Sequence, residues 1–210
     1  RFIQKSVEVT PLSTVYVFEN QKARVTLEFT TPLLLDRLDV MARPVSYVEY
    51  KVERIDGVEG GVEFFFGISA ECTVNNTDRK VEFKKTPYSL CVGNTVQNTL
   101  AYSGDHVLID WGYLHLCDTS AFVTTVEPYT RPEITKEFNA YTDRVYLAVN
   151  KTDPSGVITL AYDEINPIEY FGEPMAEYYK KYFDSFGDMV RAAKAQYTEI
   201  KELCRAFDKK

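Results

Sequence analysis

Apolar and polar positions alternate from Phe2 to about Ile165, which predicts a series of half-buried antiparallel strands. In one such run, Val25, Leu27 and Phe29 are separated by more polar residues. Asp, Asn, Gly and Ser lie between the runs, as is typical of turns. Because no helical pattern intervenes, we expect a mostly β fold: a large, supersandwich-like β-sandwich of two antiparallel sheets. Besides the runs around Val15 and Val25, predicted strands span 2–10, 45–55, 61–75, 79–84, 106–117, 121–127, 143–150 and 156–163.

The pattern changes to a helical one near the end of the chain. Pro167, Gly172 and Pro174 indicate an irregular join. Ser185 and Asp188 then have the spacing of a helix N-cap and its capping box. Apolar residues follow at helical spacing, so one continuous helix of about 33 Å is predicted. These apolar residues are Met189, Ala193, Tyr197, Ile200, Cys204 and Phe207.

A helix with this much apolar surface has to dock, either on the sandwich or on a further domain. We therefore expect a β-sandwich domain over residues 1–172 and, over residues 173–210, a helical linker towards a C-terminal domain.

Charge and composition narrow the possible partners. The formal net charge is −7, and both nucleic acids and anionic membranes attract basic rather than acidic surfaces. We expect neither as a partner, and the chain shows neither an apolar run long enough to span a membrane nor a signal peptide. The aromatic content of 14% indicates packing between sheet faces, although an exposed sugar-binding platform is an alternative.

The cysteines and histidines do not form a recognisable metal site. Cys72, Cys91, Cys117 and Cys204 are widely spaced without a CxxC pair, and buried thiols are expected, although the sequence leaves their pairing open. His106 and His115 lie nine residues apart in one predicted strand. An odd separation directs them to opposite faces, so they should not share a metal.

Acidic residues provide the best candidates for chemistry. Asp163 ends the last predicted strand next to Tyr162, and Asp110 precedes Trp111 in an earlier one. A glycosidase needs two facing carboxyl groups, but the sequence does not place these two relative to each other. The alternative is that Asp163 bonds the backbone at the join. Asp36 and Asp39 similarly indicate either a calcium site or an organised loop or short helix before Arg43 and Pro44.

Several blocks resemble the glutaminase A family. The main one is FTTPLLLDRLDVMARPVSYVEY at residues 29–50, which is similar to the family pattern F-[TS]-[TS]-P-L-L, D-L-D and S-R-P-V-[ST]-Y. Further similar blocks, in consistent order, are QKSVEVTPLSTVYVFE at 4–19, IDWGYLHL at 109–116 and LAYDEINPIEYFG at 160–172. The chain departs from the pattern at Met41-Ala42 and Asn166-Pro167.

The resemblance implies an N-terminal β-sandwich domain that precedes an α/α-toroid domain of the six-hairpin kind. The expected function is non-catalytic: the chain would support or rim the active site of its partner, the C-terminal catalytic domain of the same parent. The parent would be a glutaminase-like amidohydrolase or a glycoside hydrolase, in a compartment that the sequence leaves open, secreted or periplasmic locations included. The alternative is a carbohydrate-binding or accessory domain.

The resemblance also gives the shared residues expected roles. No catalytic residue, metal ligand or cofactor is expected in this chain. The structural motif comprises Arg43, Pro44 and Tyr47. The candidates for an interdomain contact or a site rim are Tyr162, Asp163, Tyr170, Phe171, Asp110 and Trp111.

Overall fold

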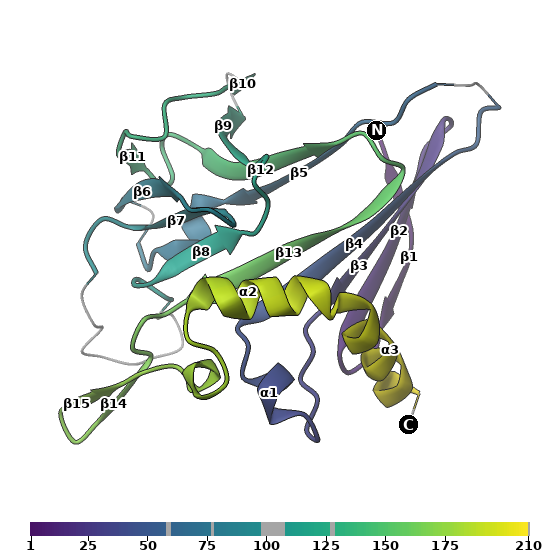
Figure 1. Cartoon of the computed structure of the whole chain (residues 1–210). Helices are drawn as coiled ribbons and strands as arrows, with labels where there is room; N and C mark the ends of the chain where they lie inside the picture. Colours follow the sequence, from purple (N-terminus) through teal and green to yellow (C-terminus); the bar gives the residue numbers. More distant parts are fainter. Residues whose placement is uncertain (58–59, 77, 98–107, 127–128, 210) are drawn as a thin grey trace. The chain divides into compact units, whose positions relative to one another are not determined.

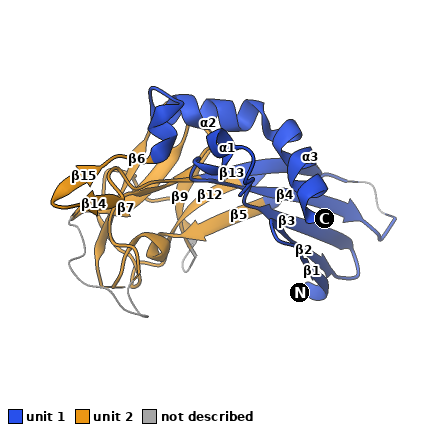
Figure 2. Ribbon diagram, turned by 90° about the horizontal axis from the view of Figure 1, so that it is seen from below, with its two compact units in different colours: residues 1–64, 150–160, 178–210 blue, residues 65–149, 161–177 orange. Residues whose placement is uncertain are grey.

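A computed structural model describes residues 1–57, 60–76, 78–97, 108–126 and 129–209 of the chain (Figure 1). Strands make up 43% and helices 18% of it, which confirms the predicted mostly β class with antiparallel sheets and a C-terminal helical segment. The chain forms two compact units, coloured separately in Figure 2. Unit 1 comprises residues 1–64, 150–160 and 178–210, and unit 2 comprises residues 65–149 and 161–177.

The sheet of unit 1 follows the predicted alternation closely. Its strands lie in the order β1 (Ile3–Val9), β2 (Ser13–Glu19), β3 (Ala23–Thr30), β4 (Val45–Arg54) and β13 (Ser155–Asp163). The first six residues of β13 belong to unit 1 and its last three to unit 2. The register between β1 and β2 shifts between Gln4 and Ser6, which indicates a β-bulge that contains Lys5.

The C-terminal segment contains two helices rather than the single helix expected. The N-terminal boundary is confirmed, since the Ser185 side chain accepts a hydrogen bond from the Asp188 N–H. However, α2 (Phe186–Ala195) ends before Gln196, and α3 (Tyr197–Asp208) begins after it. The Ala193 carbonyl accepts the Tyr47 hydroxyl at 2.9 Å. A side chain inserted into the helical hydrogen-bond ladder is a known cause of a kink.

The helix pair packs on the sheet of unit 1. Tyr47 on β4 contacts the ring of Tyr197 at 4.9 Å, and Lys201 forms an ion pair with Glu28 on β3. Asp208, at the end of α3, accepts hydrogen bonds from Thr10 and from the Leu12 N–H. The first of the two expected docking modes is therefore confirmed. The buried helical residues include Met189, Val190, Ala193, Ile200 and Cys204.

Unit 1 also contains two short helices, α1 (Leu38–Met41) and η2 (Tyr178–Lys181). Helix α1 contains Asp39. For this residue and Asp36, the sequence indicated two alternatives: a calcium site, or an organised loop or short helix. Arg37 binds both carboxylate oxygens of Asp39, at 2.9 and 3.0 Å. These ion-pair contacts support the structural alternative for Asp39.

Unit 2 contains shorter strands in two sheets and a hairpin. The sheet orders are β8-β7-β6-β11 and β10-β9-β12-β5, and β14 pairs with β15. The elements are β5 (Phe64–Ser69), η1 (Ala70–Thr73), β6 (Lys80–Lys85), β7 (Leu90–Asn94), β8 (Tyr113–Leu116), β9 (Phe122–Val126), β10 (Tyr129–Thr130), β11 (Phe138–Asn139), β12 (Val145–Lys151), β14 (Ile168–Tyr170) and β15 (Glu173–Met175).

Three expectations for unit 2 were wrong. Strand 61–75 ends at Ser69, because the Ser69 side chain caps the short helix η1 through the Glu71 N–H. Within the described part of strand 106–117, regular pairing begins only at Tyr113, after Gly112 has turned the backbone with a φ of +80°. The segment around Pro174, expected to be irregular, forms the β14–β15 hairpin.

Candidate functional site

Asp110 is buried and serves the local backbone. One of its carboxylate oxygens accepts hydrogen bonds from the Asn75 N–H at 3.0 Å and from the Asn94 side-chain amide at 2.8 Å. The other oxygen lies 3.9 Å from the Arg79 guanidinium. These contacts hold the segment before β8, and they occupy the carboxylate with structural partners.

Tyr162 and Trp111 are in contact, through the Tyr162 side chain and the Trp111 backbone carbonyl. The Tyr162 hydroxyl donates to the Trp111 carbonyl at 2.9 Å. Burial raises the pKa of Tyr162, so its hydroxyl stays protonated at neutral pH. A Cβ atom at Gly112 would lie 2.4 Å from the Asp163 carbonyl oxygen. Only glycine therefore fits at this crossing, where the IDWGYLHL and AYDEI blocks meet.

Asp163 and its neighbours organise the chain after β13. The Asp163 carboxylate accepts the Ile165 N–H at 3.1 Å, which supports the alternative that it bonds the backbone. The Glu164 N–H donates to the buried Glu177 carboxylate at 2.8 Å. Burial raises the pKa of Glu164. These contacts fix the base of the hairpin that follows.

Tyr170 and Phe171 lie at the tip of the β14–β15 hairpin and are exposed. Tyr170 pairs with Glu173, leaving Phe171 and Gly172 as a two-residue turn. Both turn residues have positive φ, 49° and 83°, as in the type I′ turns of tight hairpins. Phe171 is 91% exposed and Tyr170 63%. A bulky residue at positive φ with its ring in solvent is unusual, and such strain is often found at functional sites.

Arg43, Pro44 and Tyr47, the residues of the expected structural motif, all lie in unit 1. The Arg43 Nε donates to the Asp39 carbonyl at 2.9 Å, and the guanidinium lies 5.0 Å from the Phe183 ring centroid. Pro44 directly precedes β4, and Tyr47 holds helix α2 as described above.

A serine–histidine contact was missed by sequence reasoning. Ser89 Oγ lies 2.8 Å from His115 Nδ1, and both residues are buried. Burial lowers the pKa of His115 to about 4, so the imidazole is neutral at pH 7. Ser89 also bonds Thr86 at 2.8 Å in the turn before β7. No spacing motif joins Ser89 to His115 in the sequence, and the other candidate, His106, lies outside the described residues.

None of the four cysteines forms a disulfide in this structure. Cys91, Cys117 and Cys204 are buried as expected, but Cys72 is exposed and lies in η1 rather than in a strand. Among the described residues, no group of three or more His, Cys, Asp or Glu side chains could hold a metal ion. A search of the helices in the described ranges finds none that is both long and apolar enough to cross a membrane.

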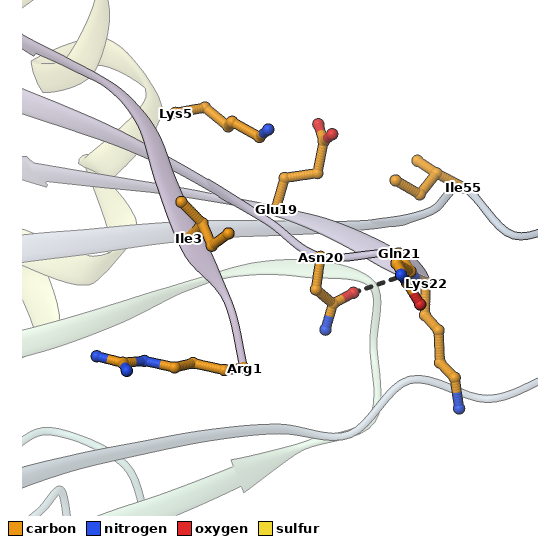
Figure 3. Close-up of a pocket in the computed structure, with 8 residues that line it drawn as sticks. All are labelled: Arg1, Ile3, Lys5, Glu19, Asn20, Gln21, Lys22 and Ile55. Carbon is orange, nitrogen blue, oxygen red and sulfur yellow. Dashed lines mark hydrogen bonds between the residues drawn. The ribbon is translucent and has the colours of Figure 1, made fainter.

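Among the hollows lined by the described residues of unit 1, two differ clearly in character. The first, about 680 Å³, is open, and its walls include Arg1, Lys5, Glu19 and Lys22. Figure 3 shows that these charged groups do not converge on one point. The second, about 420 Å³, is a groove over β2 and β3 that has aromatic walls and no charged residue. Of the two, the groove has the more uniform chemistry.

Comparison with family models identifies one family. The model described as a domain of unknown function, DUF5127, matches residues 12–145 and 142–210. This match covers most of the chain. The chain belongs to the DUF5127 family. No curated protein matches it. Membership of DUF5127 leaves the activity open, because the family description assigns none.

Proposed function

We propose that this chain is the non-catalytic β domain of a glutaminase A-like hydrolase. In this proposal, the β14–β15 hairpin contacts the C-terminal domain that carries the reacting groups. The sequence resemblance over residues 4–19, 29–50, 109–116 and 160–172 supports the kind of parent. Family membership is compatible with the proposal but adds no activity to it.

The exposed tip of the hairpin is the observation that carries the proposal. Phe171 and Tyr170 contact each other, with ring centroids 4.6 Å apart, yet both remain largely in solvent. Ile168 and Met175, which face each other across the ladder, are 56% and 48% exposed. A small apolar patch on a rigid turn is typical of a surface that another protein surface covers.

The remaining candidates would act indirectly in this proposal. The internal contacts described above involve Tyr162, Asp163 and Asp110. The Trp111 carbonyl accepts the hydrogen bond from the Tyr162 hydroxyl. They would therefore position the base of the hairpin rather than contact substrate. Their substitution should destabilise unit 2 itself.

The test replaces Phe171 by Asn in the two-domain parent and in this chain alone. Phe171→Asn creates Asn-Gly, the preferred pair for a type I′ turn, so the hairpin is kept while the ring is lost. We expect the isolated chain to melt at the same or a higher temperature. In the parent, we expect faster proteolysis between the domains and reduced hydrolysis of L-glutamine or of glycoside substrates.

The matched control is Tyr141→Asn, because Tyr141 is also exposed, at 54%, but lies in the connection between β11 and β12 rather than in the hairpin. Equal effects of the two substitutions on the parent would contradict the contact. A loss of stability in the isolated Phe171→Asn chain would instead assign the ring an internal packing role. Hydrolysis of either substrate class by the isolated wild-type chain would overturn the non-catalytic assignment.

A second candidate function, carbohydrate recognition, is supported by the aromatic groove of unit 1.

A further inference from the structure

The aromatic groove lies on the face of the unit 1 sheet that the helices do not cover. In the β2–β3 register, Thr14 pairs with Phe29 and Tyr16 pairs with Leu27, so these side chains share one face with Phe18. Helices α2 and α3 contact the opposite face, through Glu28 and Tyr47. The groove therefore has no share in the packing of the helix pair.

Three aromatic rings shape the groove. The ring planes of Tyr16 and Phe18 are within 14° of parallel, with centroids 6.0 Å apart. The ring of Phe29 is also 6.0 Å from Tyr16 but nearly perpendicular to it, at 87°. Two parallel rings and one upright ring, completed by Leu27 and Thr14, line a volume of about 420 Å³. This volume falls in the range of small-molecule sites, about 300–1,000 Å³.

The rings are not an ordinary part of the core. Tyr50 lies on the same sheet face, opposite Leu27 on the neighbouring strand. It is buried, and its ring stacks on Phe64 with centroids 4.2 Å apart. In contrast, Phe29 is 38% exposed, and Val7, which pairs with Tyr16, is 48% exposed. The apolar face of the sheet therefore extends beyond the residues that cover it.

The chemistry of the walls limits the ligand. No charged side chain lines the groove, which disfavours a strongly anionic or cationic ligand. The face of an aromatic ring is electron-rich and attracts weakly positive C–H groups. A pyranose presents several C–H groups on one face and hydroxyls around its edge. The hydroxyls of Tyr16 and Thr14 can exchange hydrogen bonds with such an edge.

We propose that this groove binds a neutral sugar unit, with the C–H face of the pyranose against an aromatic ring of the groove. A protein partner would use the same apolar area. The groove is favoured for a sugar because its rings are parallel, uncharged and bordered by hydroxyls. The site lies in unit 1 and does not depend on the hairpin, so its failure would leave the proposed domain contact unaffected.

The test is affinity electrophoresis of the chain in gels containing soluble β-glucan, xylan, galactomannan or polygalacturonate. We expect at least one neutral polysaccharide, but not polygalacturonate, to retard the wild-type chain. The double substitution Tyr16→Leu and Phe18→Leu keeps apolar volume on the strand and removes the ring faces. It should weaken binding by about tenfold or more, whereas the control Tyr141→Leu should leave binding unchanged.

A second variant covers the case in which the double substitution fails to fold, as judged by circular dichroism. Thr14→Lys keeps all three rings and places a long charged side chain across the groove, so it should also abolish retardation. The proposal is overturned if no neutral polysaccharide retards the chain, or if a folded groove variant still binds. It is also overturned if light scattering shows a wild-type dimer that the double substitution dissociates, because the face would then bind a second copy.

Discussion

At the scale of single residues, several polar side chains of unit 2 bond neighbouring groups of the fold. Asp110 and Asp163 bond backbone N–H groups, and His115 shares a hydrogen bond with Ser89. Each of these side chains would be read as a catalytic candidate from its residue type alone. Their partners indicate instead that they hold turns and strand ends in place.

His115 should make stability depend on pH in a defined window. Its pKa is lowered by burial from 6.5 to about 4, so between these values the unfolded chain binds more protons than the folded one. Stability should therefore fall as the pH drops from about 6.5 to 4, by up to about 3 kcal/mol at about 1.4 kcal/mol per pKa unit. Urea unfolding of the wild type and of His115→Asn, measured from pH 7 to 4, isolates this contribution.

Asn is the chosen replacement because its side-chain oxygen can still accept from Ser89. Carboxyl groups titrate in both proteins, so only the difference between the two curves is informative. Parallel curves over the window would show that His115 does not supply the pH dependence.

Gly112, the glycine of the IDWGYLHL block, should not tolerate substitution. In Gly112→Ala, the new Cβ would meet the Asp163 carbonyl oxygen at 2.4 Å, with φ at +80°. We expect a loss of at least about 2 kcal/mol of unfolding free energy. Gly61→Ala is the matched control, because a Cβ there meets nothing within 4 Å, and it should be neutral or slightly stabilising. Equal urea midpoints for both variants would contradict this.

At the scale of elements, the attachment of α3 combines burial with a buried ion pair. The Lys201 side chain is only 5% exposed, and its Nζ lies 2.5 Å from Glu28 and 3.2 Å from the Thr30 hydroxyl. Thr30 in turn bonds Ser13 at 3.1 Å. The polar groups of β2 and β3 thus find partners beneath a helix that otherwise buries apolar residues.

Removing the charge of Lys201 should be costly, because Glu28, whose side chain is only 16% exposed, would lose its near partner and keep Arg205 at 3.9 Å. We expect Lys201→Met to lower the unfolding free energy by about 3 kcal/mol. Arg191→Met removes an exposed ion pair with Asp188 on α2 and should leave stability nearly unchanged. Chemical denaturation compares the two. If Lys201→Met proves neutral, the ion pair with Glu28 does not help to hold α3.

At the scale of the whole molecule, the four thiols report on the fold in one measurement. Cys72 is exposed, whereas Cys91, Cys117 and Cys204 are buried, and burial raises the pKa values of Cys91 and Cys204 to about 11. Burial also raises the pKa of Cys72, so its exposure gives access to a reagent without activating the thiol. A thiol reagent such as Ellman's should therefore titrate one thiol before the others in the native chain and four after unfolding without reductant. Fewer than four after unfolding would indicate a disulfide.

The fold class was predictable because alternation directly records which strand faces are buried. The runs around Val15 and Val25 and the capped start at Ser185 all correspond to real elements. The break at Gln196 was not predictable, since the Ala193 carbonyl just before it bonds the hydroxyl of Tyr47, 146 residues earlier in the chain. Strand β7 was missed because all five of its residues are buried, so it shows no alternation.

The candidate sites were predictable only in part. The motif around Tyr170 and Phe171 was recognisable from resemblance. The exposure of these two side chains depends on a type I′ turn, which the pair Phe-Gly does not predict. The groove was not predictable, because Tyr16 and Tyr50 belong to similar alternating runs. Whether such a ring is buried depends on which residues pack over it in the folded chain, as Phe64 does over Tyr50.

The bulge at Lys5 bears on how this protein behaves at high concentration. Strand β1 ends the order of its sheet, and such a border is a natural template for fibril growth. Here an incoming strand would meet a ladder whose spacing changes between Gln4 and Ser6, with a cation at the irregularity. Edge strands with such an irregularity pair poorly with further strands. The β-bulge at Lys5 should therefore help to prevent edge-to-edge association of separate copies of the chain.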